Sequence, residues 1–260
     1  MSITRQNLSV IIVSYKSDYV IENCIDSIDS EIEIIVIDNS GNDQLKEKIE
    51  SKYKNVKCIL SKENLGMGAG NNLGIKNVNK DYVLILNPDV ILEKSSIDEM
   101  IQSSKEIDNF GVIAPLSDKN EYPNYTLKKV HNFNSTKPFK VKSVDGYAML
   151  LNLKKLKKLE DFYFFDENFF LYLENEDLCK RLEKNNEDIY IIPNFSISFD
   201  ARIISSIKLF SKVTSGFNIN TKSLFTFLIP KLFPPPMPRF SFDKIHLTFL
   251  YLVSIFSFNL

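Results

Sequence analysis

The sequence predicts an α/β fold with a mostly parallel central sheet flanked by helices. Short apolar runs rich in β-branched residues, which are typical of buried strands, recur between residues 8 and 192. Segments with apolar residues at three-and-four spacing separate these runs, as helices covering a parallel sheet would. Polar residues directly follow several of the runs, and in such sheets ligands bind at the carboxyl ends of the strands.

The first part of the chain shows this alternation most clearly. Residues 18–30, for example, place their apolar side chains on one stripe of a helix. The expected strands here are 8–13, 32–37, 56–60 and 82–86, and the expected helices are 18–30, 43–52, 69–78 and 95–107.

The pattern loosens after residue 111, although it still predicts local structure. The expected elements are a strand at 111–116, a polar loop at 117–140, an apolar stretch at 144–153, a long segment at 166–185 that enters a helix near Glu176, and a last strand at 189–192.

Residues 201–260 differ in composition from the rest of the chain. They hold seven basic residues against one acid, and ten of the twenty phenylalanines. Their last sixteen residues carry no formal charge, but a membrane-spanning helix needs roughly 18–20 apolar residues. The alternatives are a basic, aromatic helical tail in peripheral contact with an anionic membrane, and a hydrophobic segment that packs on the domain or on a partner chain in a homo-oligomer. We therefore predict a domain at 1–200 and a tail at 201–260.

Composition excludes several functional classes. The net charge of −1 provides no global positive field, so nucleic acid is not an expected partner. Cys24, Cys58 and Cys179 have no paired spacing, which argues against disulfides and structural zinc and favours buried thiols in a reducing, cytoplasmic compartment. No apolar run before Tyr15 is long enough for a signal sequence.

Half of the eight glycines stand in one short stretch, at Gly66, Gly68, Gly70 and Gly74. Glycine permits close backbone approach, and a helix N-terminus can hold an anion. The G-x-G-x-G spacing after the third strand differs from the G-x-G-x-x-G that follows the first strand of dinucleotide sites. The alternatives are a ligand-binding turn, with Asn64, Asn71 and Asn72 as polar groups, and a tight strand-to-helix turn without a ligand.

One aspartate and one cluster of three acids carry the candidate chemistry. Asp89 stands just after the strand at 82–86, where a carboxylate beside a diphosphate can hold Mg²⁺ or Mn²⁺. The alternative is a proline turn in which Asp89 caps the next helix.

Glu174, Glu176 and Asp177 form a dense acidic group, and crowded carboxylates raise one another's pKa, which suits a general base. The alternative is a solvated helix start whose acids favour the helix dipole.

Six segments occur in a recognisable order: VIIVSYKS (10–17), IIVIDNSGND (34–43), ENLGMGAGNNLGI (63–75), YVLILNPDV (82–90), VDGYAMLLNL (144–153) and FDENFFLYLENEDLCKRL (165–182). Together they resemble the inverting family 2 glycosyltransferases of the GT-A fold, and most of all their bacterial rhamnosyltransferase branch, which builds surface polysaccharides. The resemblance covers about residues 8–200. It implies transfer of a sugar such as rhamnose from a dTDP- or UDP-sugar donor to a lipid-linked or glycan acceptor, at the inner face of the cytoplasmic membrane.

The resemblance also implies roles for individual residues. It implies that nucleotide-sugar binding involves Ser14, Tyr15, Asp38, Asn64, Gly66, Asn71 and Asn87. Asp89 matches the last position of the DXD-type motif that holds Mg²⁺ or Mn²⁺, and Asn87 stands where the first acid of that motif often stands. The acidic motif that carries the catalytic base supplies Glu174, Glu176 and Asp177, and Gly146 matches an acceptor-side loop.

Two positions depart from the family pattern. The acidic motif commonly reads Glu-Asp-x-Asp, and here Asn175 takes its second position, so a neighbouring acid must act as base or the enzyme is impaired. Many relatives carry a histidine before Asp-Ala-Arg, and here Phe199 precedes Asp200. The second hypothesis is therefore an impaired relative that binds nucleotide sugar or acts as a scaffold in polysaccharide assembly. A nucleotidyltransferase is the third, against which the sequence lacks a glycine-rich, basic triphosphate loop near its first strand.

Overall fold

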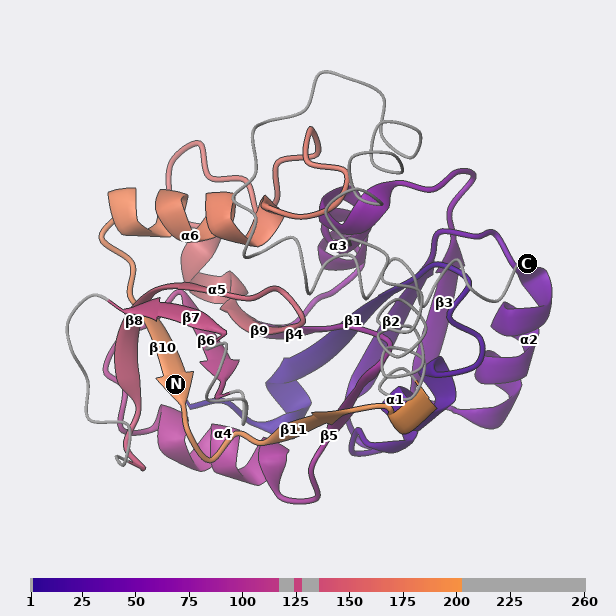
Figure 1. Cartoon of the computed structure of the whole chain (residues 1–260), viewed down its shortest axis with the longest axis horizontal. Coiled ribbons are helices and arrows are strands. Elements are labelled where there is room, and N and C mark those ends of the chain that lie inside the picture. The colour runs from indigo at the N-terminus through magenta and orange to yellow at the C-terminus, as the bar shows by residue number, and fades with distance from the viewer. Residues whose placement is uncertain (1, 117–123, 128–135, 203–260) are drawn as a thin grey trace, which may run out of the picture. The chain divides into compact units, whose positions relative to one another are not determined.

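The computed structural model describes residues 2–116, 124–127 and 136–202 (Figure 1). Their main feature is a nine-stranded sheet in the order β3-β2-β1-β4-β9-β6-β10-β8-β7. The strands are β1 (Leu8–Ser14), β2 (Glu33–Asp38), β3 (Val56–Leu60), β4 (Tyr82–Leu86), β6 (Val112–Pro115), β7 (Tyr125–Leu127), β8 (Phe139–Val144), β9 (Ala148–Asn152) and β10 (Ile189–Ile192). Two further short strands are β5 (Val90–Leu92) and β11 (Ile197–Phe199).

The predicted α/β architecture is confirmed, and the sheet is mixed. Strands β3, β2, β1 and β4 are parallel, as the alternation of strands and helices predicts. Strand β9 then runs antiparallel between β4 and β6. Strand β8 likewise runs antiparallel to its neighbour β10, so β8 and β9, which residues 145–147 connect, run in the same direction with the parallel strands β6 and β10 between them. The parallel half is the part that brings successive strand ends to one edge.

Helices cover the sheet on both sides. Figure 1 shows α3, α5 and α6 above the sheet and α1 and α4 below it. Their bounds are α1 (Ile21–Asp26), α2 (Asp43–Lys52), α3 (Gly66–Lys76), α4 (Ser96–Ser104), α5 (Leu153–Leu156) and α6 (Glu174–Lys184), and a 3₁₀ turn η1 (Arg5–Asn7) precedes β1.

Several boundaries differ from those the sequence predicts. Helix α1 ends early, and the Ser27 hydroxyl donates to the Cys24 carbonyl (2.6 Å) in its last turn. Helix α3 begins at Gly66, so the glycine cluster lies within the helix and not before it. Helix α6 begins at Glu174, which puts all three candidate acids in its first turn. Strand β7 lies within the segment expected to be a polar loop.

Helix α3 packs on β1 through two of its glycines. A Cβ atom at Gly74 would lie 2.6 Å from Ile11 Cγ2, and one at Gly70 would lie 2.9 Å from Val13 Cγ1. Favourable carbon–carbon contact begins at about 3.5 Å, so only hydrogen fits at these positions. Because residues four apart share a helix face, the two glycines form one surface that seats the helix against the strand.

The three cysteines are free and buried, as predicted. Burial raises the pKa of Cys58 and of Cys179 to about 12, so both stay protonated at neutral pH. These thiols therefore act as core side chains and not as nucleophiles.

The chain divides into two units, Met1–Ser198 and Phe199–Leu260, and the predicted tail lies outside the described residues from position 203 onward. The domain boundary near residue 200 and the two alternatives for the tail stay predictions. In the described part of the chain, no helix combines the length and apolar character that crossing a bilayer requires.

Replacing Gly74 by Ala tests the seating of α3. In a free helix this change would stabilise by about 1 kcal/mol, because alanine has the higher helix propensity. Here we expect a loss of about 1–3 kcal/mol in the free energy of unfolding, because the methyl group meets Ile11. Urea denaturation measures the difference, with Lys76→Ala on the exposed part of the same helix as control. Unchanged or increased stability of Gly74→Ala would contradict the packing role.

Candidate active site

Three strand ends and one turn meet at the same edge of the sheet. Ser14 at the end of β1 is the register partner of Asp38 at the end of β2. Leu86 at the end of β4 pairs with Ala148 at the start of β9, and Asn87 N donates to the Tyr147 carbonyl (2.9 Å). The polar residues after β1, β2 and β4 therefore share one edge, as the sequence predicts.

Asp38 organises the turn that follows β2. Its carboxylate accepts hydrogen bonds from Ser40 N (3.2 Å), Ser40 Oγ (2.8 Å) and Asn42 N (2.7 Å). These bonds use most of the acceptor positions that a carboxylate offers. Asp38 thus has a structural role in the turn, and its predicted contact with a nucleotide base stays a prediction.

The start of α3 is hydrogen-bonded both to the residue that follows β2 and to the segment before α6. Asn39 Nδ2 donates to the Gly66 carbonyl (3.0 Å), and Met67 N donates to the Phe170 carbonyl (2.9 Å). Gly66 has φ +76°, and a Cβ there would lie 2.0 Å from the Phe170 carbonyl oxygen. Both the left-handed backbone and the close approach require glycine at position 66.

Buried polar atoms at this edge point to a ligand. Among the described residues, Ser14 Oγ, Asn71 Oδ1 and Asn87 Oδ1 are buried and have no hydrogen-bond partner. A buried polar atom without a partner costs about 1–3 kcal/mol, so native proteins rarely keep several of them in one region without a reason. Three residues that the sequence assigns to nucleotide-sugar binding thus keep an unused oxygen.

Asp89 is buried in the turn after β4, with 3% of its surface exposed. Burial first, and then the charge of Asp89, raise the pKa of the Cys24 thiol well above its usual range. The Asp89 carboxylate and the Asn87 amide oxygen are hard oxygen donors, the type that Mg²⁺ and Mn²⁺ prefer. This donor set fits a divalent cation that takes its remaining ligands from a diphosphate. Within residues 2–116, 124–127 and 136–202, no three His, Cys, Asp or Glu side chains are grouped to hold a metal by themselves.

Glu174 is a buried carboxylate at the first residue of α6. Only 8% of its surface is exposed, and its Oε2 has no hydrogen-bond partner in the described part of the chain. Burial raises the pKa of Glu174 from 4.5 to about 7. A carboxylate with this pKa can accept a proton at neutral pH and is a stronger base than an ordinary glutamate.

The backbone before Glu174 is strained. Tyr172 and Leu173 both have left-handed φ values, 68° and 71°. Such values are unfavourable for residues with large side chains, and they gather at functional sites where the surrounding structure enforces them. Burial, and then the charge of Glu174, raise the pKa of Tyr172, so the phenol stays protonated beside the carboxylate.

Asn175 joins α6 to the β8–β9 turn. Its Nδ2 donates to the Val144 carbonyl (2.7 Å), and a Cβ at Gly146 would touch the Asn175 side chain at 3.4 Å. An aspartate cannot donate this bond. Asn175, which stands at the second position of the Glu-Asp-x-Asp pattern, therefore anchors the start of α6 to the sheet edge, with Glu174 and Glu176 on either side of it in the sequence.

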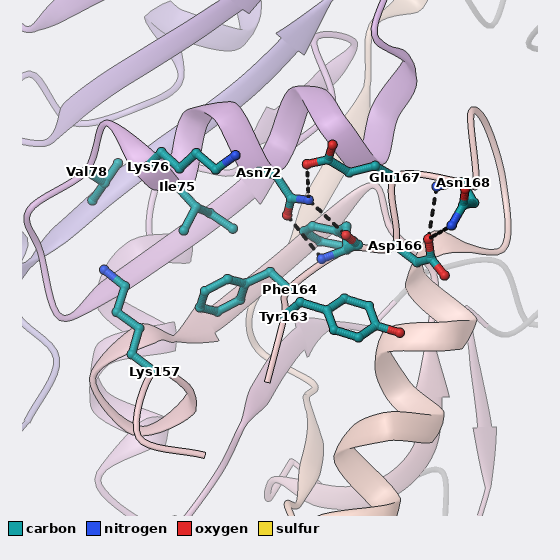
Figure 2. Close-up of a pocket in the computed structure, with 11 residues that line it drawn as sticks. Asn72, Ile75, Lys76, Val78, Lys157, Tyr163, Phe164, Asp166, Glu167 and Asn168 are labelled. Atoms are coloured by element: carbon teal, nitrogen blue, oxygen red, sulfur yellow. Dashed lines mark hydrogen bonds between the residues drawn. The ribbon is translucent and has the colours of Figure 1, made fainter. Parts of the chain in front are cut away.

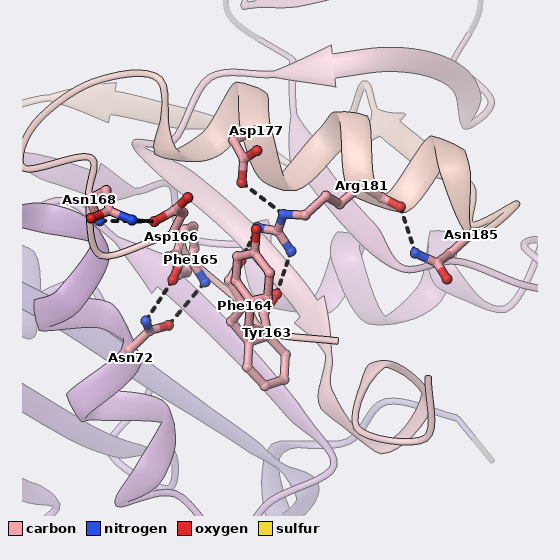
Figure 3. A network of polar contacts seen from close by, with 9 residues as sticks. All are labelled: Asn72, Tyr163, Phe164, Phe165, Asp166, Asn168, Asp177, Arg181 and Asn185. Carbon is pink, nitrogen blue, oxygen red and sulfur yellow. Dashed lines mark hydrogen bonds and ion pairs between the residues drawn. The ribbon is translucent and has the colours of Figure 1, made fainter. Parts of the chain in front are cut away.

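The other two candidate acids have protein partners. Glu176 Oε1 accepts from Ser143 Oγ (3.4 Å), and Asp177 forms an ion pair with Arg181 (2.8 Å). Figure 3 shows Arg181 between Asp177 and the Tyr163–Phe164 backbone, and its guanidinium donates to both of those carbonyls. Asp177 thus belongs to a structural network, and of the three acids Glu174 has the properties of a base.

Comparisons with known proteins identify the family. The family model described as glycosyl transferase family 2 matches residues 9–171, which is more than half of the chain. The chain belongs to glycosyl transferase family 2.

Two proteins similar to this chain differ in how much of their length is matched. The low-salt glycan biosynthesis hexosyltransferase Agl10 of Haloferax volcanii is 29% identical over 70% of this chain, and the match spans 64% of Agl10. The rhamnosyltransferase WbbL of Escherichia coli K12 is 25% identical over 92% of this chain and 98% of WbbL.

Solved structures share the fold of the family 2 domain at low sequence identity. GalNAc-T7, solved with UDP, GalNAc and Mn²⁺, has a TM-score of 0.61 at 14% identity, over 74% of this chain and 43% of that one. The mannosyltransferase PcManGT of Pyrobaculum calidifontis, solved with GDP-Man and Mn²⁺, has a TM-score of 0.57 at 11% identity, over 84% of this chain and 66% of that one. These similarities show the GT-A fold.

Two of the remaining predicted residues of the family 2 site have local partners. Tyr15 is half-buried with the Lys16 ammonium group 5.5 Å from its ring centre, and Asn64 Oδ1 accepts from Gly66 N (3.1 Å). Their contacts with a nucleotide sugar stay predictions. Asn39 lies in the polar cluster that the sequence places at the end of the second strand, whereas sequence reasoning does not assign Arg181 to the site. Only the spacing of four between Asp177 and Arg181 could have indicated an ion pair.

Replacing Glu174 by Gln tests the burial of its charge. Below pH 4.5 the carboxyl group is protonated in both folded and unfolded chains, so the variant should match the wild type. As pH rises from 4.5 to about 7, the unfolded chain releases this proton before the folded chain does, so the wild type loses stability on the order of 3 kcal/mol, and the loss is complete above about pH 7. We therefore expect Glu174→Gln to be more stable than the wild type at pH 8 in urea denaturation. Glu176→Gln controls for charge removal in the same turn, and an equal gain in that control would contradict the account.

Proposed function

We propose that the chain is an inverting hexosyltransferase, which moves a sugar from a nucleoside diphosphate to an acceptor hydroxyl. The observation that carries this proposal is Glu174, whose pKa of about 7 suits a base at neutral pH. Its anchor, Asn175, is hydrogen-bonded to Val144, and the turn after Val144 is hydrogen-bonded to Asn87 at the end of β4. The base is thus attached to the same edge that carries Asp89.

In the proposed reaction, Glu174 accepts the proton of the acceptor hydroxyl. The hydroxyl oxygen attacks the anomeric carbon from the face opposite the diphosphate. A new glycosidic bond forms, the bond from the anomeric carbon to the phosphate oxygen breaks, and the configuration at carbon inverts. The electron pair leaves with the nucleoside diphosphate. Base catalysis of this type typically contributes about 10²–10⁴-fold to the rate.

The leaving diphosphate gains negative charge, and the residues after β4 are suited to receive it. Asp89 and Asn87 would hold a Mg²⁺ or Mn²⁺ ion, which would stabilise that charge electrostatically. The buried oxygens of Ser14 and Asn71 would accept hydrogen bonds from the donor nucleotide or sugar.

The names of relatives support narrower choices of substrate. WbbL, a rhamnosyltransferase, aligns with the chain over nearly all of its length, which favours rhamnose or another deoxyhexose as the transferred sugar. A dTDP- or UDP-sugar is then the donor, and a lipid-linked or glycan acceptor in surface polysaccharide synthesis receives it. The basic and aromatic composition of residues 201–260 is consistent with an acceptor at the inner face of the cytoplasmic membrane.

A second candidate function is nucleotide-sugar binding without transfer. It is favoured by Asn175, which fills the motif position where the family commonly carries an acid. Under this alternative, the chain would bind the donor and act as a scaffold in polysaccharide assembly.

Variants of the acidic turn separate these functions. We expect Glu174→Gln to lower kcat by about 10²–10⁴-fold, because it removes the base. Glu176→Gln is the matched control and should keep turnover within about tenfold of the wild type. In the wild type, kcat/KM should fall as pH decreases below about 7, because Glu174 becomes protonated. Equal losses in both variants, or full activity of Glu174→Gln, would contradict the assignment.

A donor screen identifies the reaction class. We expect one nucleotide sugar to raise the melting temperature selectively, and more strongly with Mn²⁺ than without it, because ligands stabilise the state that they bind. Asp89→Asn should remove the metal dependence. Release of the nucleoside diphosphate upon transfer supports the proposal, whereas pyrophosphate release would indicate a nucleotidyltransferase. Donor binding without transfer to any lipid-linked acceptor would support the scaffold alternative.

A further inference from the structure

A groove of about 700 Å³ lies between α3 and the segment that connects α5 to α6 (Figure 2). Ile75, Lys76 and Val78 line it from the side of α3, and residues 163–168 line it from the other side. This volume falls within the range of small-molecule sites, roughly 300–1,000 Å³. None of the residues proposed above for the transfer reaction lines it.

The groove leads from the opposite edge of the sheet toward the candidate active site. Val78 precedes β4, whose first residue Tyr82 pairs with Asn152 at the end of β9, and Lys157 follows shortly after β9. That end of the groove is therefore at the edge opposite to Asp89. Residues 163–168 then lead toward Phe170, which contacts the start of α3 at the active-site edge.

Basic and acidic side chains lie toward opposite ends of the groove. Figure 2 shows Lys157 and Lys76 toward the Val78 end, and Asp166 and Asn168 toward the other end. In the part of the chain that the structure describes, neither lysine forms an ion pair. One end thus offers two ammonium groups to an anion.

The acidic end offers hydrogen-bond acceptors to hydroxyl groups. Asp166 uses Oδ1 to accept from Asn168 (2.9 Å from its N), and Glu167 uses Oε1 to accept from Asn72 (2.9 Å). Each carboxylate therefore keeps its second oxygen for a ligand. Because these bonds hold the carboxylates in place, a ligand hydroxyl would meet pre-oriented acceptors.

An aromatic surface lies between the two ends. The Phe164 ring is part of the groove, and Tyr163 is 48% exposed. The Arg181 guanidinium lies over one face of the Tyr163 ring, 4.0 Å from its centre, and so helps to hold the ring in place. A rigid ring with an exposed face is a platform on which the apolar face of a sugar can stack.

We propose that this groove binds an anionic oligosaccharide, with its carboxylate or phosphate at Lys76 and Lys157 and its hydroxyl groups at Asp166 and Glu167. Its identification as the non-reacting part of the acceptor glycan rests on the proposed function. In that role the groove holds sugar units remote from the transferred one, and so selects acceptors by their charge.

The test measures binding to the full chain by NMR titration, without donor or metal, so it does not depend on transfer. The probes are trigalacturonate, phosphorylated maltotriose and neutral maltotriose, which separate carboxylate, phosphate and uncharged ligands. We expect at least one anionic probe to bind more tightly than neutral maltotriose. The double variant Lys76→Gln/Lys157→Gln should weaken that binding by about tenfold or more, because two charge-assisted contacts are lost.

Matched variants control for the loss of charge and for the loss of an exposed aromatic ring. Lys94→Gln/Lys184→Gln removes the same charge from exposed positions outside the groove and should leave binding unchanged. Tyr163→Ala should weaken binding, whereas Phe170→Ala, which removes an equally exposed ring elsewhere, should not. Glu174→Gln should bind as the wild type does, so a failure of the transferase assignment stays distinguishable. The absence of binding by both anionic probes, equal binding of neutral maltotriose, or an equal loss in the control pairs would overturn the proposal.

Discussion

Helix α3 lies so close to β1 that no side chain fits between them at Gly70 and Gly74. This close contact fixes the height of the helix above the sheet, and the rest of the site follows from it. The first residue of the helix, Gly66, contacts the Phe170 backbone and receives the Asn39 side chain from the end of β2. The segment that leads into α6 is therefore positioned by the strand core, through a helix whose glycines allow the approach.

Burial of Glu174 is the functional consequence of this packing. Removing an ionised carboxylate from water is unfavourable, and this cost raises the pKa of Glu174 to about 7. The surrounding structure enforces it through left-handed residues at 172 and 173, the Asn175 anchor to Val144, and the Arg181 network shown in Figure 3. Stability is given up at this residue, and the result is a carboxylate that can accept a proton at neutral pH.

Much of this arrangement was predictable from the sequence, because it depends on local pattern. Apolar runs identified the parallel strands, and polar residues at their ends identified Ser14, Asn87 and Asp89 as neighbours. The choice among Glu174, Glu176 and Asp177 was only partly predictable. The spacing of four indicates the Asp177–Arg181 ion pair. The contact of Glu176 with Ser143, on a strand distant in sequence, and the burial of Glu174 depend on the tertiary structure. The packing role of Gly70 and Gly74 was likewise hidden, since a glycine-rich ligand turn and a tight helix–strand contact have the same composition.

The central claim is that Glu174 is a buried carboxylate that titrates near neutrality. A ¹³C NMR titration of the chain labelled at the glutamate carboxyl carbons measures this directly, with Glu174→Gln to assign the signal. The account predicts one carboxyl signal that titrates at about pH 7 and disappears in the variant. A Glu174 signal that titrates at about 4.5, like that of a glutamate exposed to water, would contradict it.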